Sequence, residues 1–184
     1  MALKSRLTGF IMEVSDKVKE LCARLQERFN AEKLYLIDVE DSKSPDSAGI
    51  FVFGLRGSSV SPLQARVDVA GFLQEATGQP IGVEIFTDPL EEIEYLFDRY
   101  LRAYIATHGG VVTPIEVQEA EGTILVSMEG GCSMCPASIG TLKLGIERTL
   151  KKHLPWVRRV ESSNEPIEPD FGIKLRLPTG AIGR

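Results

Sequence analysis

Two stretches of the chain, 74 residues apart, share one pattern of glycine, proline and apolar residues. At this offset Gly57-Ser58-Ser59-Val60-Ser61-Pro62 aligns with Gly131-Cys132-Ser133-Met134-Cys135-Pro136. The apolar pairs that also match are Ile50 with Ile124, Val52 with Val126 and Val83 with Val157, and four extra residues in the first hairpin bring Ile37-Asp38-Val39 onto Ile115-Glu116-Val117. Because glycine and proline set turns and helix starts, this repetition predicts two copies of one supersecondary unit.

Apolar periodicity predicts the order helix, strand, strand, helix, strand in each half of the chain. In the first half it predicts a helix over 9–29, strands over 34–39 and 50–55, a helix over 62–77 and a strand over 81–86. In the second half it predicts a helix from Pro89, strands over 114–119 and 123–129, a helix from Pro136 to about Leu154 and a strand over 157–162. We therefore expect an α+β fold of two tandem modules, the first a degenerate repeat of the second.

The expected boundaries follow from composition and capping signals. Asp88 and Pro89 form a helix start, so the first module should end near residue 87 and the second should cover 88–163. Residues 164–184 are punctuated by proline and glycine and form a tail, in which only Phe171 to Leu177 alternates as a strand does.

Two thiols in the second module lie where a predicted strand gives way to a helix. Pro136 suits the first helical turn, so Cys135 is the expected N-cap and Cys132 lies in the turn before it. Unpaired N–H groups and the positive end of the helix dipole favour thiolate, the form that binds metal. A CxxC pair supplies only two of the four ligands that zinc or an iron–sulfur cluster takes. A second copy of the chain would complete the site on a symmetry axis.

Other candidate ligands within the chain have simpler interpretations. Cys22 lies on the apolar stripe of the first predicted helix, as a small core residue would. His108 is expected at the surface, at a helix end. In the first module Ser58 and Ser61 occupy the ligand positions, and hydroxyls bind a soft cluster poorly. The first module is therefore expected to keep the fold without the chemistry, as a docking or dimerisation surface or as a spacer that stabilises its neighbour.

The segment from about Tyr95 to Glu161 carries a set of motifs in a fixed order. These are His108-Gly109-Gly110, Ile115-Glu116-Val117, Gly131-Cys132-Ser133-Met134-Cys135-Pro136, Thr141-Leu142-Lys143-Leu144-Gly145-Ile146-Glu147 and Pro155-Trp156-Val157. In them the segment resembles the NifU-like domain of iron–sulfur scaffold and carrier proteins of the Nfu type. His108 stands where that family usually has Asp, and Met134 where it often has Gly. The resemblance implies that Cys132 and Cys135 hold a labile [4Fe-4S] cluster between two protomers, take it from cluster assembly proteins and pass it to apo-proteins.

Composition narrows the class of protein further. A chain of 184 residues with 43% apolar and 26% charged residues has a globular composition, and no long apolar span or signal peptide is recognised in it. Three cysteines with one pair at metal spacing indicate a reducing cytoplasm, and a formal charge of −5 argues against nucleic acid as a partner. No carboxylate pair, nucleophile triad or phosphate loop indicates a conventional enzyme.

Two alternatives remain open at this point. The CxxC pair could act as a thiol–disulfide redox site in a monomer. Four thiolates could also hold zinc in a structural dimer, because tetrahedral four-sulfur sites suit either metal. The resemblance to the NifU-like domain favours an iron–sulfur cluster over zinc.

The second module also carries two charged helix faces and one tryptophan whose positions can be predicted. Along the helix from Pro89, the acidic residues, Glu92 among them, are predicted to form a solvated face. A basic cluster follows the CxxC, and it is predicted to be a solvated face or a partner-docking surface; its members are Lys143, Arg148, Lys151, Lys152, Arg158 and Arg159. Trp156 is predicted to cover the core as an apolar lid.

Overall fold

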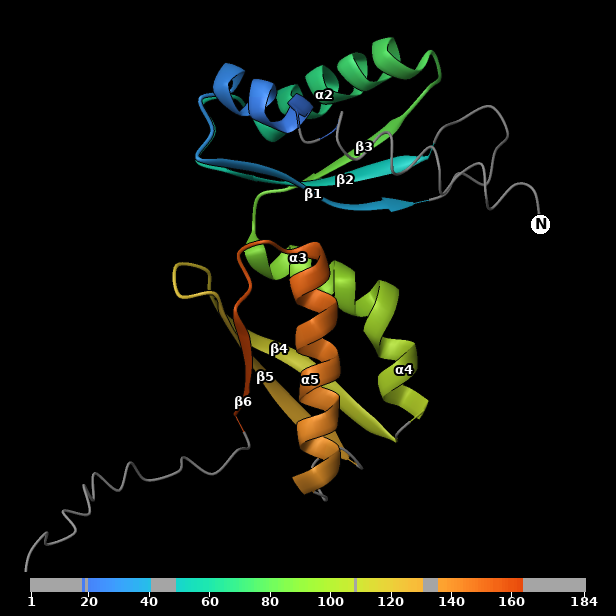
Figure 1. Ribbon diagram of the computed structural model, residues 1–184, viewed down its shortest axis with the longest axis vertical. Coiled ribbons are helices and arrows are strands. Elements are labelled where there is room, and N and C mark those ends of the chain that lie inside the picture. The colour runs from blue at the N-terminus through green and yellow to red at the C-terminus, as the bar shows by residue number, and fades with distance from the viewer. Residues whose placement is uncertain (1–17, 19, 41–48, 108, 131–135, 164–184) are drawn as a thin grey trace, which may run out of the picture.

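The computed structural model describes residues 18, 20–40, 49–107, 109–130 and 136–163 (Figure 1). In the first module a helix covers residues 20–28, followed by β1 (Lys33–Glu40), β2 (Ile50–Arg56), α2 (Pro62–Thr77) and β3 (Gly82–Phe86). The second module contains α3 (Pro89–Leu96), the π-helical turn η1 (Phe97–Leu101), α4 (Arg102–Thr107), β4 (Gly110–Gln118), β5 (Thr123–Gly130), α5 (Pro136–His153) and β6 (Arg159–Ser162). The prediction of an α+β fold with two strand-containing modules is confirmed.

The two sheets have the same topology. Their strand orders are β1-β2-β3 and β4-β5-β6, and in each the first pair is antiparallel and the second parallel. Each first strand also carries a β-bulge, between Leu36 and Asp38 in β1 and between Pro114 and Glu116 in β4. The bulged residues are Ile37 and Ile115, the two isoleucines that the sequence comparison pairs.

The strand register corrects that comparison by one residue. Leu36 pairs with Phe53 and Pro114 with Val126 at the bulges, so Phe53 corresponds to Val126 rather than to Ser127. A slip of one residue moves every side chain of a strand to the other face. The pairings of Ile50 with Ile124 and of Val52 with Val126 are therefore wrong. The loop before Pro136 is consequently one residue longer than the loop before Pro62.

The third strands of the two sheets also align differently from the sequence comparison. Val83 lies opposite Phe51 in the first sheet, whereas Val160 lies opposite Ile124 in the second. Val160 is thus the counterpart of Val83, and the pairing of Val83 with Val157 is wrong. Both valines are buried.

The predicted ends of two strands also differ from the structure. β4 begins at Gly110, four residues earlier than predicted, because Gly110 to Thr113 pair with the end of β5. β6 begins at Arg159 because the N–H groups of Arg158 and Arg159 both donate to the carbonyl of Gly122. Residues 9–17 and 19 of the predicted first helix and the tail strand at 171–177 lie outside the described residues.

Two hydrophobic cores stabilise the molecule, and one of them crosses the module boundary. The first joins the helix at 20–28 and α2 to the inner face of the first sheet, including Phe51, Phe53 and Leu55. The second lies under α3 and α5 and also contains Ile37 and Val52 from the outer face of the first sheet. In Figure 1 the end of α5 and the start of α3 lie against β1 and β2. The first sheet is therefore covered on both faces.

Within the described residues, every helix is too short or too polar to cross a membrane.

Candidate functional site

Cys132 and Cys135 fall in residues 131–135, which lie outside the described residues, but both ends of this loop are described. β5 ends at Gly130, one residue later than predicted, and α5 begins at Pro136 as predicted. Gly110 at the start of β4 pairs with Gly130 at the end of β5. The cysteine loop therefore begins beside the Gly109-Gly110 turn and leads directly into an 18-residue helix.

Backbone contact between glycines fixes where the loop starts. Gly130 has φ of 71° and Gly109 has φ of 66°, both in the left-handed region that favours glycine. A Cβ on Gly130 would lie 2.8 Å from the carbonyl oxygen of Gly109, closer than van der Waals contact permits. Only glycine therefore fits at this strand end without a shift of the neighbouring backbone.

Cys22 and His153, the other cysteine and the one histidine within the described residues, lie away from this loop. Cys22 is buried in the first core, and burial raises the pKa of its thiol to about 11, so it is an uncharged core residue as predicted. His153 lies at the far end of α5, where its Nδ1 is 2.9 Å from the carbonyl oxygen of Ile37. A helix of 18 residues separates its two ends by roughly 25 Å. His108 lies outside the described residues.

Among the residues that the structure describes, no group of three or more His, Cys, Asp and Glu side chains could hold a metal ion.

The corresponding loop of the first module is held by local hydrogen bonds. Ser59 Oγ donates to the carbonyl of Phe29 at 2.7 Å, and Ser58 Oγ lies 3.4 Å from the same oxygen. Ser61 Oγ accepts from the N–H of Gln64 at 3.2 Å and caps α2, with Pro62 at its first position. Ser61 precedes Pro62 as Cys135 precedes Pro136. The N-cap role expected of Cys135 thus has an observed counterpart in the first module.

A buried charge network between the modules was missed by the sequence reasoning. Glu92 of α3 is fully buried, so its assignment to a solvated face was wrong. Its carboxylate accepts from Tyr35 Oη at 2.8 Å and pairs with Arg56 Nη2 at 3.0 Å. Trp156 Nε1 donates to Tyr35 Oη at 2.9 Å and lies 3.4 Å from Glu92, while Arg56 Nε also pairs with Glu119 at 3.0 Å. Trp156 covers the core as predicted and adds a polar contact across the boundary.

The environment of Glu92 alters its proton affinity. Burial raises the pKa of Glu92 to about 7, although Arg56 and the hydrogen bonds from Tyr35 and Trp156 oppose the change. Every buried side-chain nitrogen and oxygen in the described residues has a hydrogen-bond partner. The network is therefore fully satisfied, which is the condition under which buried polar groups specify one arrangement of neighbouring elements.

A second polar cluster joins the modules at the other end of β1. Asp38 accepts from Tyr100 Oη at 2.7 Å, from Tyr95 Oη at 3.1 Å and from Arg99 Nε at 3.1 Å. The Tyr100 ring stacks on His153 with centroids 4.8 Å apart. An aspartate inside an otherwise apolar strand is the sequence signal that could have indicated this contact.

Comparison with known proteins identifies the second module. The sequence model of the NifU-like domain matches residues 93–161, from α3 through β6 and across the cysteine loop. The chain thus carries a NifU-like domain of the Nfu type at residues 93–161.

Curated relatives agree with this assignment. The chain is 36% identical over 91 residues to Fe/S biogenesis protein NfuA of Stenotrophomonas maltophilia, covering 50% of this chain and 44% of the relative. It is 37% identical over 81 residues to NfuA of Xanthomonas campestris pv. campestris, covering 44% and 40%, and 38% identical over 83 residues to NfuA of Acinetobacter baumannii, covering 44% and 39%. The matched region thus spans less than half the length of these relatives.

Proposed function

We propose that this protein holds a labile [4Fe-4S] cluster on Cys132 and Cys135 of two protomers and transfers it to apo-proteins. The observation that carries the proposal is the NifU-like match at residues 93–161, which includes both cysteines at their place between β5 and α5. The relatives that the chain matches over 91 and 81 residues are named Fe/S biogenesis protein NfuA.

The local architecture supports a cluster that is bound but can be transferred. The cysteines directly precede α5 in the chain, and the N-terminus and dipole of a helix favour thiolate over thiol. Two ligands per chain leave half of a cluster's coordination to a second copy, so assembly of the dimer and loading of the cluster are coupled. Incoming thiolates of a recipient can then replace one pair at a time. This is ligand exchange and needs no general base.

Several details belong to the same proposal. The donors are cluster assembly proteins, the recipients are apo iron–sulfur proteins, and the compartment is the cytoplasm. The module boundaries are 1–87 and 88–163, followed by the tail at 164–184. The first module, which lacks the cysteines, stabilises the second or serves as a docking surface. The protein acts as a carrier or scaffold rather than as an enzyme.

The test is anaerobic purification followed by analysis of iron, sulfide and zinc, with size exclusion before and after cluster reconstitution. We expect about two iron and two sulfide per chain, with dimer formation on loading. Cys132→Ser should lose the cluster and the dimer together. Cys22→Ala is the matched control and should load as the wild type does, because Cys22 is a buried core residue.

Two other outcomes would replace the proposal. Zinc without sulfide would indicate a zinc-bridged structural dimer. A metal-free monomer whose CxxC cycles reversibly between dithiol and disulfide would indicate thiol–disulfide redox chemistry.

A further inference from the structure

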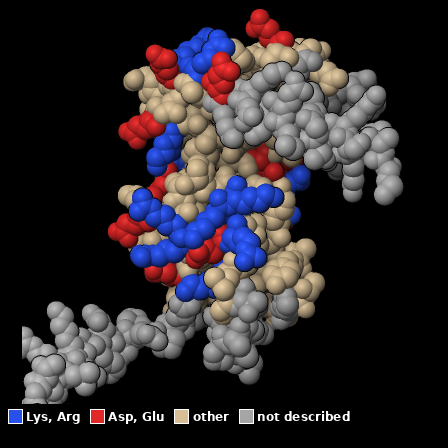
Figure 2. Space-filling view, viewed as in Figure 1, with Lys and Arg blue, Asp and Glu red and all other residues tan. Residues whose placement is uncertain are grey.

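One face of α5 carries a stripe of basic side chains that the cluster chemistry does not use. The helix buries Leu142, Ile146 and Leu150 in the second core and exposes the opposite side. The basic residues on this side and on the adjoining β6 segment are Lys143, Arg148, Lys151, Lys152, Arg158 and Arg159. Figure 2 shows the blue Lys and Arg atoms as a band across the middle of the molecule, over the end of α5 nearest the first module.

Internal ion pairs account for only part of this charge. Lys151 pairs with Glu147, and Arg159 pairs with Glu161 at 2.8 Å. The carboxylate of Glu147 also accepts from the N–H of Val160, which ties it to the fold. In the described part of the chain no ion pair joins Arg148, Lys152 or Arg158 to a carboxylate. The helix dipole stabilises positive charges in the last turn of α5, where Lys151 and Lys152 lie. Arg148 and Arg158 lie outside that turn, so the dipole does not explain their presence.

An exposed leucine lies within the same stripe. Leu144 is 63% exposed, although it lies on a helix whose other leucines are buried. It precedes Arg148 by four residues, so the two side chains are neighbours on one face. It also lies eight residues beyond Pro136, about 12 Å along the axis from the cysteine end of the helix. An apolar contact with a charged rim is the usual make-up of a protein interface.

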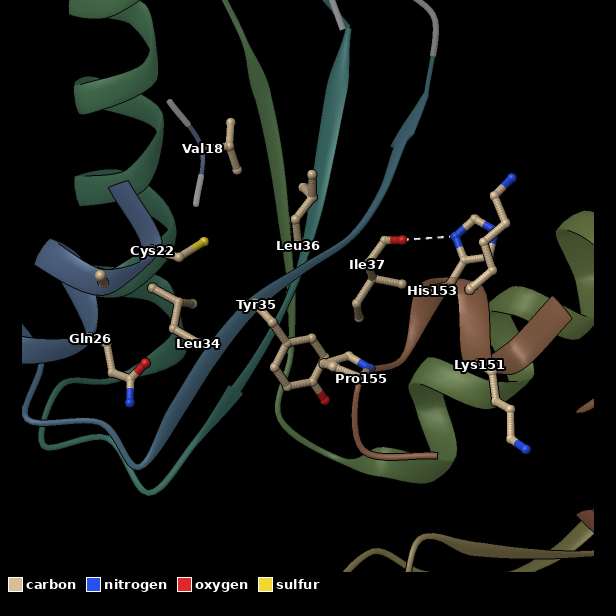
Figure 3. A pocket seen from close by; sticks show the side chains of 12 residues that line it. Val18, Cys22, Gln26, Leu34, Tyr35, Leu36, Ile37, Lys151, His153 and Pro155 are labelled. Atoms are coloured by element: carbon tan, nitrogen blue, oxygen red, sulfur yellow. Dashed lines mark hydrogen bonds between the residues drawn. The ribbon is translucent and has the colours of Figure 1, made fainter. Parts of the chain in front are cut away.

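The other end of the stripe opens into a groove between the modules. The groove has a volume of about 590 Å³, and its lining includes Lys151, Lys152 and Pro155 at the end of α5 and Tyr35 and Ile37 of β1. Figure 3 shows Tyr35 and Ile37 on the side of β1 toward Pro155 and His153, whereas Leu34 lies on the opposite side, beside Cys22. The groove thus combines positive charge at its rim with apolar side chains inside. Leu144 and Arg148 form the same combination, and both would suit a partner that is acidic with an apolar contact.

We propose that the exposed face of α5, from Leu144 to Lys152, is where the recipient of the cluster docks, and that the recipient presents an acidic surface with an apolar contact for Leu144. This inference rests on the proposed function. Charge complementarity selects the occupant, because a basic stripe on a protein of formal charge −5 attracts an acidic partner to this one face. Docking here would bring the recipient within reach of the cysteine loop at the start of the same helix. Nucleic acid is the less favoured occupant, since the overall charge opposes it and the stripe includes an exposed apolar residue, Leu144.

The experiment measures cluster transfer from the loaded protein to two acceptors, an acidic apo-ferredoxin and a small-molecule iron chelator. The double variant Arg148→Glu/Lys152→Glu should slow transfer to the ferredoxin at least tenfold and abolish its salt dependence, and Leu144→Ser should slow it about threefold. Transfer to the chelator should not change, because the chelator needs no docking surface.

Matched controls carry the same changes on the first module. Arg24→Glu/Arg28→Glu reverses two exposed charges on the helix at 20–28, and Leu63→Ser changes a leucine of α2 that is 70% exposed. Both controls should transfer to either acceptor at the wild-type rate.

The possible experimental outcomes distinguish a wrong docking site from a wrong carrier function. Variants that load normally and transfer to the ferredoxin at the wild-type rate would overturn the docking site and leave the carrier function standing. If the wild type fails to load, binding of labelled apo-ferredoxin to the cluster-free protein tests the surface alone, and equal binding by wild type and double variant would overturn it. Salt-sensitive binding to duplex DNA that the double variant loses, without binding to the ferredoxin, would also overturn it.

Discussion

The two modules share a topology but differ in the loop that precedes their second helix. Between Gly57 and Pro62 the first module has four residues, and its serines bond to Phe29 and Gln64. After Gly130, whose backbone matches that of Gly57, the second module has five residues and two thiols before its proline. Strand register and helix caps thus maintain the fold without the cysteines. The loop is the part of the module that can change its chemistry while the frame stays the same.

The modules also differ in what covers the outer face of each sheet. The bulged Ile37 of the first sheet is 3% exposed, because the second module packs on it, whereas its counterpart Ile115 is 50% exposed. Glu92 and Arg56 join the modules at the same face. This favours the interpretation of the first module as a support for the second. Its outer sheet face is occupied and is not free for another partner.

The largest expected effect is at Gly54, where Glu92 of the second module and Tyr35 lie directly against the backbone of β2. A Cβ there would overlap Glu92 Oε1 and lie 2.5 Å from Tyr35 Cζ. Gly54→Ala should lower the free energy of unfolding by about 3 kcal/mol, because it overpacks a buried site and disturbs a buried ion pair. Urea denaturation monitored by the fluorescence of Trp156 measures this change.

Gly71→Ala is the control for that measurement. Gly71 lies in α2 with open space around its Cα, so alanine should raise the free energy of unfolding by about 0.5–1 kcal/mol. If Gly54→Ala were as harmless, the modules would not be locked together at this point.

The glycines at the two strand ends provide the next comparison. Both have positive φ, so alanine costs about 1–2 kcal/mol at either site. At Gly57 the new Cβ would meet the side chain of Glu32, which can move, whereas at Gly130 it would meet the backbone carbonyl of Gly109. Gly130→Ala should therefore cost about 2–3 kcal/mol and Gly57→Ala about 1 kcal/mol. Equal costs in urea denaturation would show that the Gly109 contact relaxes freely.

Much of this frame could be predicted from the sequence. Helix starts at Pro62, Pro89 and Pro136 are local signals, and the Ser61 and Asp88 caps make the hydrogen bonds that their positions imply. Register could not be predicted as well. Chance identities such as Ile50 with Ile124 favour the 74-residue offset for β2 and β5, which the strand pairing at the bulges of Ile37 and Ile115 excludes. A bulge cannot be recognised from amino-acid composition.

The parts of the structure that the sequence did not reveal depend on contacts between distant segments. Glu92 follows the periodicity of a solvated face, and only the approach of Tyr35 and Arg56 from another module buries it. The CxxC pair was the clearest signal in the sequence, since both of its flanks are where they were predicted. The geometry of Cys132 and Cys135 themselves lies outside the described residues.

The pH dependence of stability should report the contact at Glu92. Folding raises the pKa of this group from 4.5 to about 7, so between these values the folded state binds more protons than the unfolded state. The free energy of unfolding therefore falls as pH rises through this range, by up to about 3 kcal/mol for this group.

Glu92→Gln removes this titration and isolates its contribution. Relative to the wild type, the variant should gain up to about 3 kcal/mol between pH 4.5 and pH 8 in urea denaturation. Glu94→Gln, on the exposed side of α3, should follow the wild type at every pH. Parallel pH profiles for the wild type and Glu92→Gln would show that folding does not raise the pKa of Glu92.

The smallest effect concerns the loop that lost the cysteines. Ser61 caps α2 through its bond with Gln64, and Ser61→Ala should cost about 1 kcal/mol. Ser61→Asn restores an N-cap oxygen and should fall within a few tenths of a kcal/mol of the wild type in the same assay. Cluster loading at Cys132 and Cys135 should be unchanged in both variants, because the first loop supports its own helix and supplies no ligand. A loss of iron in Ser61→Ala would show instead that the two loops are coupled, and the division of labour between the modules would have to be revised.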